Sequence, residues 1–394
     1  MKRKKTRFFW VFWVTVFLVH GVAPGLAEAR PVRRVAKQQL QDDRPPYAAA
    51  ILMEAATGQV LFEQELHKQW PPASLTKMML MLLVMEKVKQ RGISLSDPVE
   101  VSAQASKIGG SQVYLKQGEV FSLEEMMRAI VIHSANDAAE AVAERIAGSV
   151  EAFVDMMNQR AKELGLKNTR YVNVHGLPPE NGQPSDLTSA YDMAVLAREL
   201  VRYPEILKWA STKKEAFRDG KFVLDNTNHL IGKYPGADGL KTGSYHEAGF
   251  NLAATAQRDG LRLISVTLGS PSNKIRFREA TRLLSMGFNN YEMLEVMRVG
   301  EAVAQEVRVK GGEINSLRPV LGSPARVFIK RSDQNKISSS IRLNNPVWAP
   351  LRKGDELGEL VVTLGNQPVG RFKLISSQEV KQSNIIKRLW DKVF

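Results

Sequence analysis

Cysteine is absent from this sequence of 394 residues. A chain without cysteine forms no disulfide and has no thiolate to offer a metal ion, so its stability must come from a hydrophobic core. The length is ample for such a core and predicts two or three domains. We expect neither a metal nor another cofactor.

Acidic residues are fewer than basic ones, with 41 Asp and Glu against 55 Lys and Arg, and the formal net charge is +14. A positive surplus favours work beside an anionic surface or polymer. By itself it is no evidence for nucleic-acid binding, and no nucleic-acid partner is expected.

Long hydrophobic runs are also scarce, and one of them lies close to the start of the chain. Residues 8–19 are aromatic and aliphatic, they follow five basic residues, and Ala27-Glu28-Ala29 fits a cleavage site. This order is typical of a secretory signal peptide, and the run is short for a membrane span of about 20 residues. We therefore predict a signal peptide over residues 1–29, followed by a flexible linker over residues 30–46. Its removal leaves a net charge of +10 on an exported protein.

A first motif, Ser74-Leu75-Thr76-Lys77, places a serine and a lysine one helical turn apart. At this spacing both side chains lie on one helix face, where a neutral amine can take the proton of the hydroxyl. A helix start followed by a solvated lysine would show the same pattern. The apolar run of residues 78–84 indicates a buried helix, which favours the chemical interpretation of Lys77.

A second motif, Ser134-Ala135-Asn136, follows a predicted helix that begins at the capping box Ser122-Leu123-Glu124-Glu125. A hydroxyl and an amide side by side can relay a proton and hold a carbonyl group. A simple turn would also favour serine and asparagine. Alone, this motif is weak evidence.

A third motif, Lys241-Thr242-Gly243, precedes two predicted antiparallel strands, residues 250–256 and 261–268. The cation and the hydroxyl can bind an anionic group, and Gly243 allows another backbone to approach closely. Two further strands are predicted near the start of the domain, residues 47–55 and 60–62. This tripeptide too is weak evidence by itself.

The order of the three motifs is much more specific than any one of them, since it matches the set shared by penicillin-binding proteins and class A β-lactamases. From about residue 47 onwards the chain resembles the low-molecular-mass penicillin-binding proteins of peptidase family S11, which act as serine-type D-alanyl-D-alanine carboxypeptidases. His175-Gly176-Leu177 and Ala248-Gly249-Phe250 add to this resemblance. A β-lactamase is disfavoured, because Glu180-Asn181 has the wrong spacing for a deacylation base.

The resemblance implies an α+β fold of the β-lactamase and transpeptidase type. A helical subdomain would pack against an antiparallel sheet covered by helices over residues 47–294, with the site between them. A small β-sandwich would follow over residues 297–375, where short alternating segments such as residues 327–329 and 369–374 fit strands.

The resemblance also implies roles for individual residues. Ser74 would be the acylated nucleophile and Lys77 its general base, while Ser134 and Asn136 would complete the proton network. The substrate-binding residues would be Lys241, Thr242, Gly243, Ser244 and Arg278. Of these, Lys241, Thr242 and Arg278 would bind the terminal carboxylate, and the backbone amides of Ser74 and Ser244 would form the oxyanion hole. For His175 we expect a structural hydrogen-bonding role.

The implied reaction is removal of the last D-alanine from peptidoglycan stem pentapeptides through an acyl-serine intermediate, with β-lactams as inhibitors that acylate Ser74. Two alternatives remain open. A D,D-endopeptidase would cut cross-linked peptides with the same residues, and an envelope scaffold would bind penicillin with little turnover. The complete set of motif residues argues against a scaffold.

The last segment, residues 378–394, changes character again. Its apolar residues fall on one helical face with basic residues around it, a pattern that predicts a helix lying in a membrane interface. The alternative is a terminal helix that packs the same apolar face on the β-rich domain. We expect a protein held at the extracytoplasmic face of the cell membrane. The apolar residues are Ile385, Ile386, Leu389, Trp390, Val393 and Phe394, and the basic ones are Lys381, Lys387, Arg388 and Lys392.

Overall fold

The computed structural model describes residue 11, residues 45–178 and residues 184–384. The predicted signal peptide, the linker, the Glu180-Asn181 stretch and most of the predicted membrane helix lie outside the described residues. The chain divides into units of residues 1–45 and 46–394, and the second unit is the one described below. Among the described residues, none of the helices has the length and apolar character needed to cross a membrane.

A five-stranded antiparallel sheet forms the centre of the N-terminal part, with the strand order β2-β1-β9-β8-β7. The strand β7 therefore lies at an edge, and it carries Lys241-Thr242-Gly243. The four strands predicted from the sequence are confirmed as β1, β2, β8 and β9. The bounds are β1 (Ala49–Glu54), β2 (Val60–Gln64), β7 (Ala237–Tyr245), β8 (Gly249–Arg258) and β9 (Leu261–Ser270).

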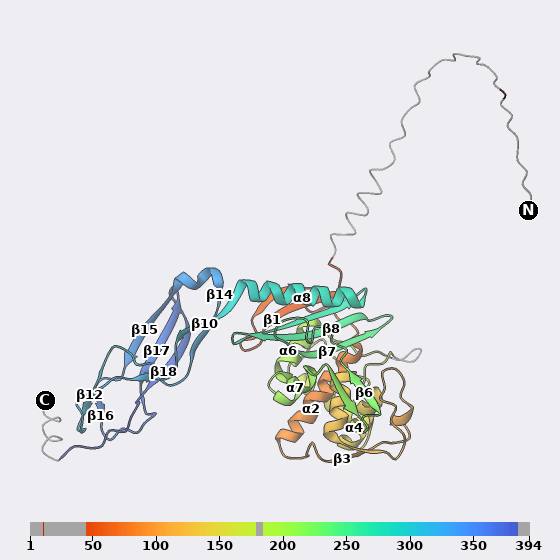
Figure 1. Cartoon of the computed structure of the whole chain (residues 1–394), viewed down its shortest axis with the longest axis horizontal. Coiled ribbons are helices and arrows are strands. Elements are labelled where there is room, and N and C mark those ends of the chain that lie inside the picture. Colours follow the sequence, from red (N-terminus) through yellow and green to blue (C-terminus); the bar gives the residue numbers. More distant parts are fainter. Residues whose placement is uncertain (1–10, 12–44, 179–183, 385–394) are drawn as a thin grey trace, which may run out of the picture. The chain divides into compact units, whose positions relative to one another are not determined.

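Helices cover both faces of this sheet (Figure 1). One face packs on α8 (Asn273–Asn290), and the other packs on the helical part of the chain. Residues of β1 alternate between the two cores, so that Ile51 joins the larger core and Leu52 contacts the α8 side. The remaining helices are α2 (Lys77–Lys89), α3 (Leu123–Arg128), α4 (Asn136–Ala147), α5 (Val150–Glu163), α6 (Ala190–Leu200) and α7 (Pro204–Ala210).

The helix α2 is buried along most of its length, since every residue from Lys77 to Met85 is shielded from solvent. Its unbroken apolar sequence explains why it lies inside the helical part rather than on its surface. The predicted capping box is also confirmed at α3. Ser122 Oγ accepts a hydrogen bond from Glu125 N at 3.2 Å, and Glu125 Oε2 accepts one from Ser122 N at 2.9 Å.

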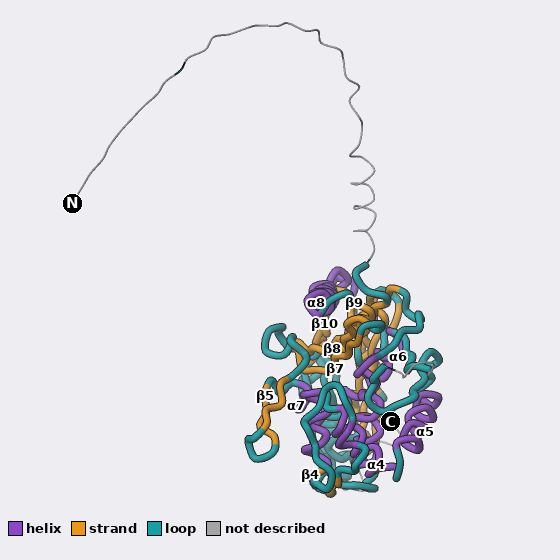
Figure 2. The backbone as a smooth tube through the Cα atoms, turned by 90° about the vertical axis from the view of Figure 1, so that its right-hand side faces the viewer, coloured by secondary structure: helices purple, strands orange, loops and turns teal. Residues whose placement is uncertain are grey.

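Two short hairpins were not predicted from the sequence. One pairs β3 (Pro98–Glu100) with β4 (Val120–Ser122), and the other, visible in Figure 2, pairs β5 (Lys214–Phe217) with β6 (Phe222–Asp225). Strands of three or four residues are too short to show a distinct alternation. The rings of Phe121 and Phe217 stack at 5.2 Å, so a contact distant in sequence joins the two hairpins.

The C-terminal part contains three further sheets. β10 pairs with β14, a four-stranded sheet has the order β13-β18-β17-β15, and a three-stranded sheet has the order β12-β11-β16. The predicted α+β class with a β-rich C-terminal part is thus confirmed. The bounds are β10 (Tyr291–Met297), β11 (Val307–Lys310), β12 (Ser316–Leu317), β13 (Val320–Leu321), β14 (Ala325–Lys330), β15 (Ile337–Leu343), β16 (Val347–Trp348), β17 (Glu356–Leu364) and β18 (Gln367–Ile375).

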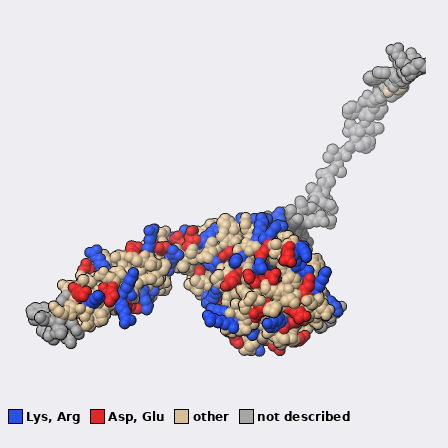
Figure 3. All heavy atoms as spheres, turned by 60° about the horizontal axis from the view of Figure 1, so that its bottom comes forward, with Lys and Arg blue, Asp and Glu red and all other residues tan. Residues whose placement is uncertain are grey.

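Basic and acidic side chains are interspersed over the surface that Figure 3 shows. The positive surplus of the sequence is therefore not gathered into one continuous face in this view. A local excess of positive charge would therefore lie where the basic side chains of one element have no acidic partner.

Candidate active site

Ser74 lies in a short 3-10 turn, η1 (Ala73–Thr76), that leads directly into α2. The next turn of the same helix carries Lys77, whose Nζ lies 3.1 Å from Ser74 Oγ. Lys77 Nζ also donates hydrogen bonds to Asn136 Oδ1 at 2.6 Å and to the His175 carbonyl oxygen at 2.7 Å. The first motif thus forms the serine and lysine pair that its spacing predicts.

The amine of Lys77 is fully buried, and burial lowers its pKa well below the ordinary value, with the charge of Lys241 acting in the same direction. A neutral amine has two N–H groups and one lone pair. The oxygens of Asn136 and His175 take the two hydrogens. The lone pair is then left for the hydroxyl of Ser74, so this amine is placed to receive the serine proton.

The second motif lies where a π-helical turn, η3 (Ala129–His133), ends and α4 begins. Ser134 has a φ of 68°, in the left-handed region that non-glycine residues seldom adopt. Asn136 is held on both sides of its amide group, because Oδ1 accepts from Lys77 and Nδ2 donates to Gly109 O at 2.7 Å. These contacts give Asn136 one defined orientation beside Lys77.

The third motif passes close to the nucleophile on the edge strand β7. A Cβ atom on Gly243 would lie 2.9 Å from Ser74 N and 2.7 Å from Pro72 O, so only glycine permits this approach. Lys241 is buried, and burial together with the charge of Arg276 lowers its pKa to about 7. Thr242 Oγ1 donates a hydrogen bond to Thr227 Oγ1 at 2.7 Å.

A cavity of about 230 Å³ brings residues of the three motifs together. Ser74, Ser134 and Asn136 line it, as do Thr242, Gly243 and Ser244 of β7, while Lys77 reaches this group through its bonds to Ser74 and Asn136. The lining is completed by Gly110, Ser111, Gly176, Leu177, Pro178, Thr227, Tyr245 and Arg276.

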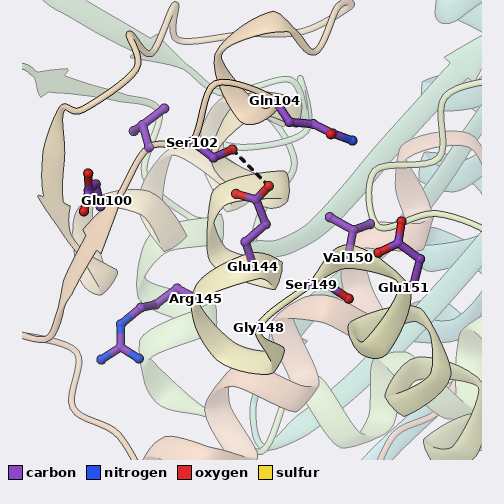
Figure 4. A pocket seen from close by; sticks show the side chains of 10 residues that line it. Glu100, Ser102, Gln104, Glu144, Arg145, Gly148, Ser149, Val150 and Glu151 are labelled. Carbon is purple, nitrogen blue, oxygen red and sulfur yellow. Dashed lines mark hydrogen bonds between the residues drawn. The ribbon is translucent and has the colours of Figure 1, made fainter.

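A larger cavity of about 550 Å³ lies between α4, α5 and the segment around Ser102 (Figure 4). Ser102 Oγ donates there to Glu144 Oε1 at 2.9 Å. None of the three motifs lines this cavity, and its described lining contains no lysine that could contact a serine as Lys77 contacts Ser74. The smaller cavity is therefore the candidate active site.

The prediction for Arg278 needs correction. Its side chain is 62% exposed and forms an ion pair with Glu279 at 2.9 Å, and Arg278 is not among the residues that line the cavity. Arg276 lines the cavity instead, is only 6% exposed, and donates from Nη1 to Gly243 O and Asn251 O at 3.2 Å each. Two residues along a helix correspond to a turn of about 200°, which places neighbouring arginines on opposite faces of α8.

The burial of Arg276 lowers its pKa to about 10, so the guanidinium remains charged at neutral pH. Its Nε is buried and has no hydrogen-bond partner among the described residues. A buried cation with a free donor at the wall of a cavity is suited to bind an anionic group. No sequence motif distinguishes Arg276 from Arg278. Which of the two faces the cavity depends on how α8 is rotated about its axis.

His175 has the structural role that its sequence context predicts, and it also contributes its backbone to the site. Its Nδ1 accepts from Leu177 N at 3.1 Å, and its carbonyl oxygen accepts from Lys77. The remaining ring nitrogen, Nε2, lies 3.8 Å from Glu140 Oε2. Burial lowers the pKa of His175 to about 3 and raises that of Glu140 to about 7.

Sequence reasoning missed Thr227, which follows the β5–β6 hairpin and meets Thr242 in the cavity. Its neighbour Asn226 donates to the backbone at and just after the end of α7, and its neighbour Asn228 donates to the backbone of β7. No recognisable sequence motif marks this segment. Among the described residues, no group of three or more His, Cys, Asp and Glu side chains is arranged to hold a metal ion.

Known proteins are similar to this chain in sequence and in fold. Residues 37–272 match the family Peptidase_S11, described as D-alanyl-D-alanine carboxypeptidase, and residues 291–382 match the C-terminal domain of penicillin-binding protein 5. The chain is similar to the D-alanyl-D-alanine carboxypeptidase DacF of Bacillus subtilis, with 39% identity over 86% of this chain and 87% of the relative.

Two solved structures are also similar. Penicillin-binding protein 5 from Haemophilus influenzae has a TM-score of 0.65 and 32% identity, covering 86% of this chain and 98% of that one. Penicillin-Binding Protein D2 from Listeria monocytogenes, in an ampicillin-bound form, has a TM-score of 0.57 and 32% identity, covering 62% of this chain and 98% of that one.

Proposed function

Since this chain belongs to the D-alanyl-D-alanine carboxypeptidase family of serine peptidases, we propose that Ser74 and Lys77 remove the terminal D-alanine from peptidoglycan stem peptides. The observation that carries this proposal is the contact of 3.1 Å between Ser74 Oγ and the buried amine of Lys77, whose pKa burial lowers well below its ordinary value. The protein is a serine-type D-alanyl-D-alanine carboxypeptidase.

In the acylation step, Ser74 Oγ attacks the carbonyl carbon of the penultimate D-alanine while Lys77 Nζ takes the hydroxyl proton. The backbone amides of Ser74 and Ser244 are proposed to stabilise the tetrahedral oxyanion, and the close approach of Gly243 to Ser74 N supports this arrangement. The C–N bond then breaks, and the leaving D-alanine amine receives a proton from Lys77 by way of the Ser134 hydroxyl. An ester between Ser74 and the peptide remains.

In the deacylation step, a water molecule attacks this ester and restores the serine. Lys77, neutral again, takes a proton from the water and returns one to Ser74 Oγ, which is the reverse of its role in acylation. Asn136 holds the Lys77 amine during both steps, because its own amide group is anchored to Gly109. A β-lactam would acylate Ser74 through the same first step, and the ampicillin-bound relative supports this proposal.

The carboxylate of the leaving D-alanine is bound best by positively charged groups. Thr242 and Arg276 line the cavity, and the buried Lys241 lies behind Thr242, to whose carbonyl oxygen its Nζ donates at 3.0 Å. Within the described part of the chain, Arg276 Nε has no hydrogen-bond partner. We therefore assign to Arg276 the carboxylate contact that the sequence predicted for Arg278. The two arginines on one helix offer a matched pair of variants.

We expect Arg276→Gln to lower kcat/KM for a substrate ending in D-Ala-D-Ala by roughly 10- to 100-fold, the loss typical of a hydrogen bond to a charged group. Arg278→Gln should change it by less than about twofold, since exposed ion pairs contribute little. A substrate ending in D-alaninamide separates binding from folding: Arg276→Gln should leave its hydrolysis nearly unchanged. Equal losses for both substrates would contradict a contact with the carboxylate.

The pH dependence of kcat/KM should report Lys241. In the free enzyme its pKa is lowered to about 7, so the amine loses its charge as the pH rises above that value and attracts the carboxylate less. We therefore expect kcat/KM to fall above about pH 7, because this parameter reports groups of the free enzyme. A bound carboxylate restores the charge, so the corresponding fall in kcat should lie at higher pH.

Lys241→Arg keeps a cation that does not titrate in this range. We expect its kcat/KM to be lower than that of the parent at pH 6 but free of the fall above pH 7. If the fall persists unchanged in Lys241→Arg, another group causes it.

The activity is tested by measuring D-alanine release from a pentapeptide ending in D-Ala-D-Ala, together with mass spectrometry of the protein after reaction with penicillin. We expect release of D-alanine and addition of one penicillin mass to the peptide that contains Ser74. Faster cleavage of cross-linked peptide dimers would favour the D,D-endopeptidase. Labelling without any hydrolysis would favour the penicillin-binding scaffold.

We further propose that the protein is exported by its N-terminal segment and held at the extracytoplasmic membrane face by residues 378–394. Peptidoglycan lies on that side of the membrane, and the amphipathic pattern of the tail fits an interfacial helix. The domain limits predicted from the sequence, residues 47–294 and 297–375, are part of this proposal. Fractionation of cells and removal of residues 385–394 would test the membrane attachment.

A further inference from the structure

Trp348 is an exposed aromatic residue at one end of the C-terminal β-rich part. Its side chain is 50% exposed, and it lies on β16, where it pairs in register with Lys310 of the parallel strand β11. Lys310 Nζ lies 5.8 Å from the centre of the Trp348 ring. A single exposed apolar side chain is common on protein surfaces, so a role for Trp348 depends on the charges and chain segments around it.

Among the described residues, the basic side chains near Trp348 are free of ion pairs, whereas most of those in the rest of this region are paired. Over residues 291–384, seven of the basic residues form ion pairs: Arg318, Arg326, Arg331, Lys336, Arg342, Arg371 and Lys373. The other seven form none within the described part of the chain. Two of these are Arg298 and Lys330, and the other five lie near Trp348: Arg308 and Lys310 on β11, Arg352 and Lys353 after β16, and Lys381. Five carboxylates lie within three residues of these basic residues, and two of them are paired elsewhere, Glu306 with Arg318 and Glu356 with Lys373. The remaining three, Glu313, Asp355 and Glu379, are fewer than the five basic residues without an ion pair in the described chain.

The described chain also ends beside Trp348. Leu351 N donates to Val380 O at 2.9 Å, Glu313 N donates to Lys381 O at 3.0 Å, and Ser383 N donates to Gly311 O at 2.9 Å. Figure 1 shows β12, β16 and the end of the described chain in the same place. The ten residues that follow Asn384 contain the apolar and basic pattern of the predicted membrane helix.

We propose that this end of the C-terminal part, formed by Trp348 with Arg308, Lys310, Arg352, Lys353 and Lys381, is a second membrane contact that places Trp348 among the headgroups of an anionic bilayer. The proposal deepens the proposed attachment through residues 378–394 and rests on it. We call this set of six residues the Trp348 patch.

The chemistry of the Trp348 patch favours a lipid surface over a protein partner. Tryptophan prefers the boundary between headgroups and acyl chains, and unpaired Lys and Arg side chains are attracted to anionic lipids. Protein interfaces bury a contiguous apolar core and are depleted in lysine. Within residues 291–384, the other large apolar side chains that are exposed are Val299 and Val369, and neither belongs to β11 or β16.

The short connection between the Trp348 patch and residues 385–394 strengthens a membrane contact that would be weak by itself. Only a few residues separate Lys381 from the apolar residues that begin at Ile385, so a bound tail keeps the patch close to the bilayer. A second contact on a short linker forms at high effective concentration. The patch would then limit how this end of the β-rich part can rotate on the membrane surface.

The absence of cysteine allows a direct test on the full exported chain, because a single introduced cysteine is labelled uniquely. Trp348→Cys is labelled with an environment-sensitive fluorophore and mixed with vesicles of phosphatidylcholine containing phosphatidylglycerol. We expect a blue shift and a rise in emission at position 348. Val369→Cys on β18 serves as the matched control, is 39% exposed, and should not respond.

A second measurement follows vesicle binding of unlabelled variants by sedimentation. Trp348→Ser should bind about tenfold more weakly than the parent, the loss expected when partial burial of an indole is removed. Tyr114→Ser, which removes an exposed aromatic residue elsewhere, should bind as the parent does. Vesicles of phosphatidylcholine alone should bind both proteins less well and reduce the fluorophore response.

Three results would overturn the proposal. If the labelled protein binds vesicles without a response at position 348, the tail is the membrane contact and the patch is not. If the parent binds no vesicles, the attachment and the patch fail together, whereas the carboxypeptidase activity is measured separately. If Trp348→Ser binds as tightly as the parent, the indole does not contribute.

Discussion

Replacing Ser74 by alanine is expected to lower D-alanine release by roughly 10⁴- to 10⁶-fold, the range seen when a serine peptidase loses its nucleophile. The Ser74 side chain is the only hydroxyl that Lys77 contacts within the described residues. A nearby water cannot replace the serine hydroxyl, because an acyl-enzyme needs an oxygen that is covalently part of the protein and lies beside the Ser74 and Ser244 amides. The variant should still bind the peptide, since the cations of the cavity are retained.

The measurement combines D-alanine release with covalent labelling by a fluorescent penicillin under denaturing conditions. Ser74→Ala should show no covalent label, whereas Ser339→Ala, on an exposed position of β15, should match the parent. An unfolding temperature equal to that of the parent would show that the variant keeps its fold. Covalent label on Ser74→Ala would place the nucleophile elsewhere.

Replacing Lys77 by glutamine should slow acylation by roughly 10³-fold or more, because it removes the general base and the alignment that base gives to the serine. Glutamine keeps donors for Asn136 Oδ1 and for the His175 carbonyl oxygen, the two groups that Lys77 Nζ bonds at 2.6 and 2.7 Å. Its amide nitrogen cannot accept a proton. The variant therefore separates the basic function of Lys77 from its structural hydrogen bonds.

The rate of acylation by a β-lactam, followed across pH, tests this prediction. Because burial lowers the pKa of Lys77, the parent should already be fast at neutral pH, whereas Lys77→Gln should gain rate only as hydroxide increases. Lys89→Gln, at the exposed end of the same helix, is the matched control. If Lys77→Gln acylates within tenfold of the parent, another group takes the serine proton.

The helix α2 shows why much of this fold was accessible to sequence reasoning. Its apolar run, the capping box at Ser122 and the alternating strands of the central sheet are local patterns, and each reports how nearby residues share a face. The short hairpins β3–β4 and β5–β6 were missed because the contacts that stabilise them, such as the ring pair Phe121 and Phe217, join distant segments. Local periodicity carries no information about such pairs.

The sequence by itself determined which residues could react. Serine with lysine one turn later, Ser-x-Asn after a buried helix, and Lys-Thr-Gly before paired strands define the three parts of the site, since residue type and helical spacing are local properties. The chain order of these motifs then identified the family. Composition likewise determined that no disulfide could stabilise the exported protein.

Only the tertiary structure decided which further groups complete the site. It selected Arg276 over Arg278, because the face of α8 toward the cavity depends on how the helix packs on the sheet. It brought Thr227 to Thr242 and the His175 carbonyl to Lys77, because these contacts join loops distant in sequence. The low pKa of Lys77 depends on the same packing, since burial, which no single motif encodes, removes the water that would stabilise its charge.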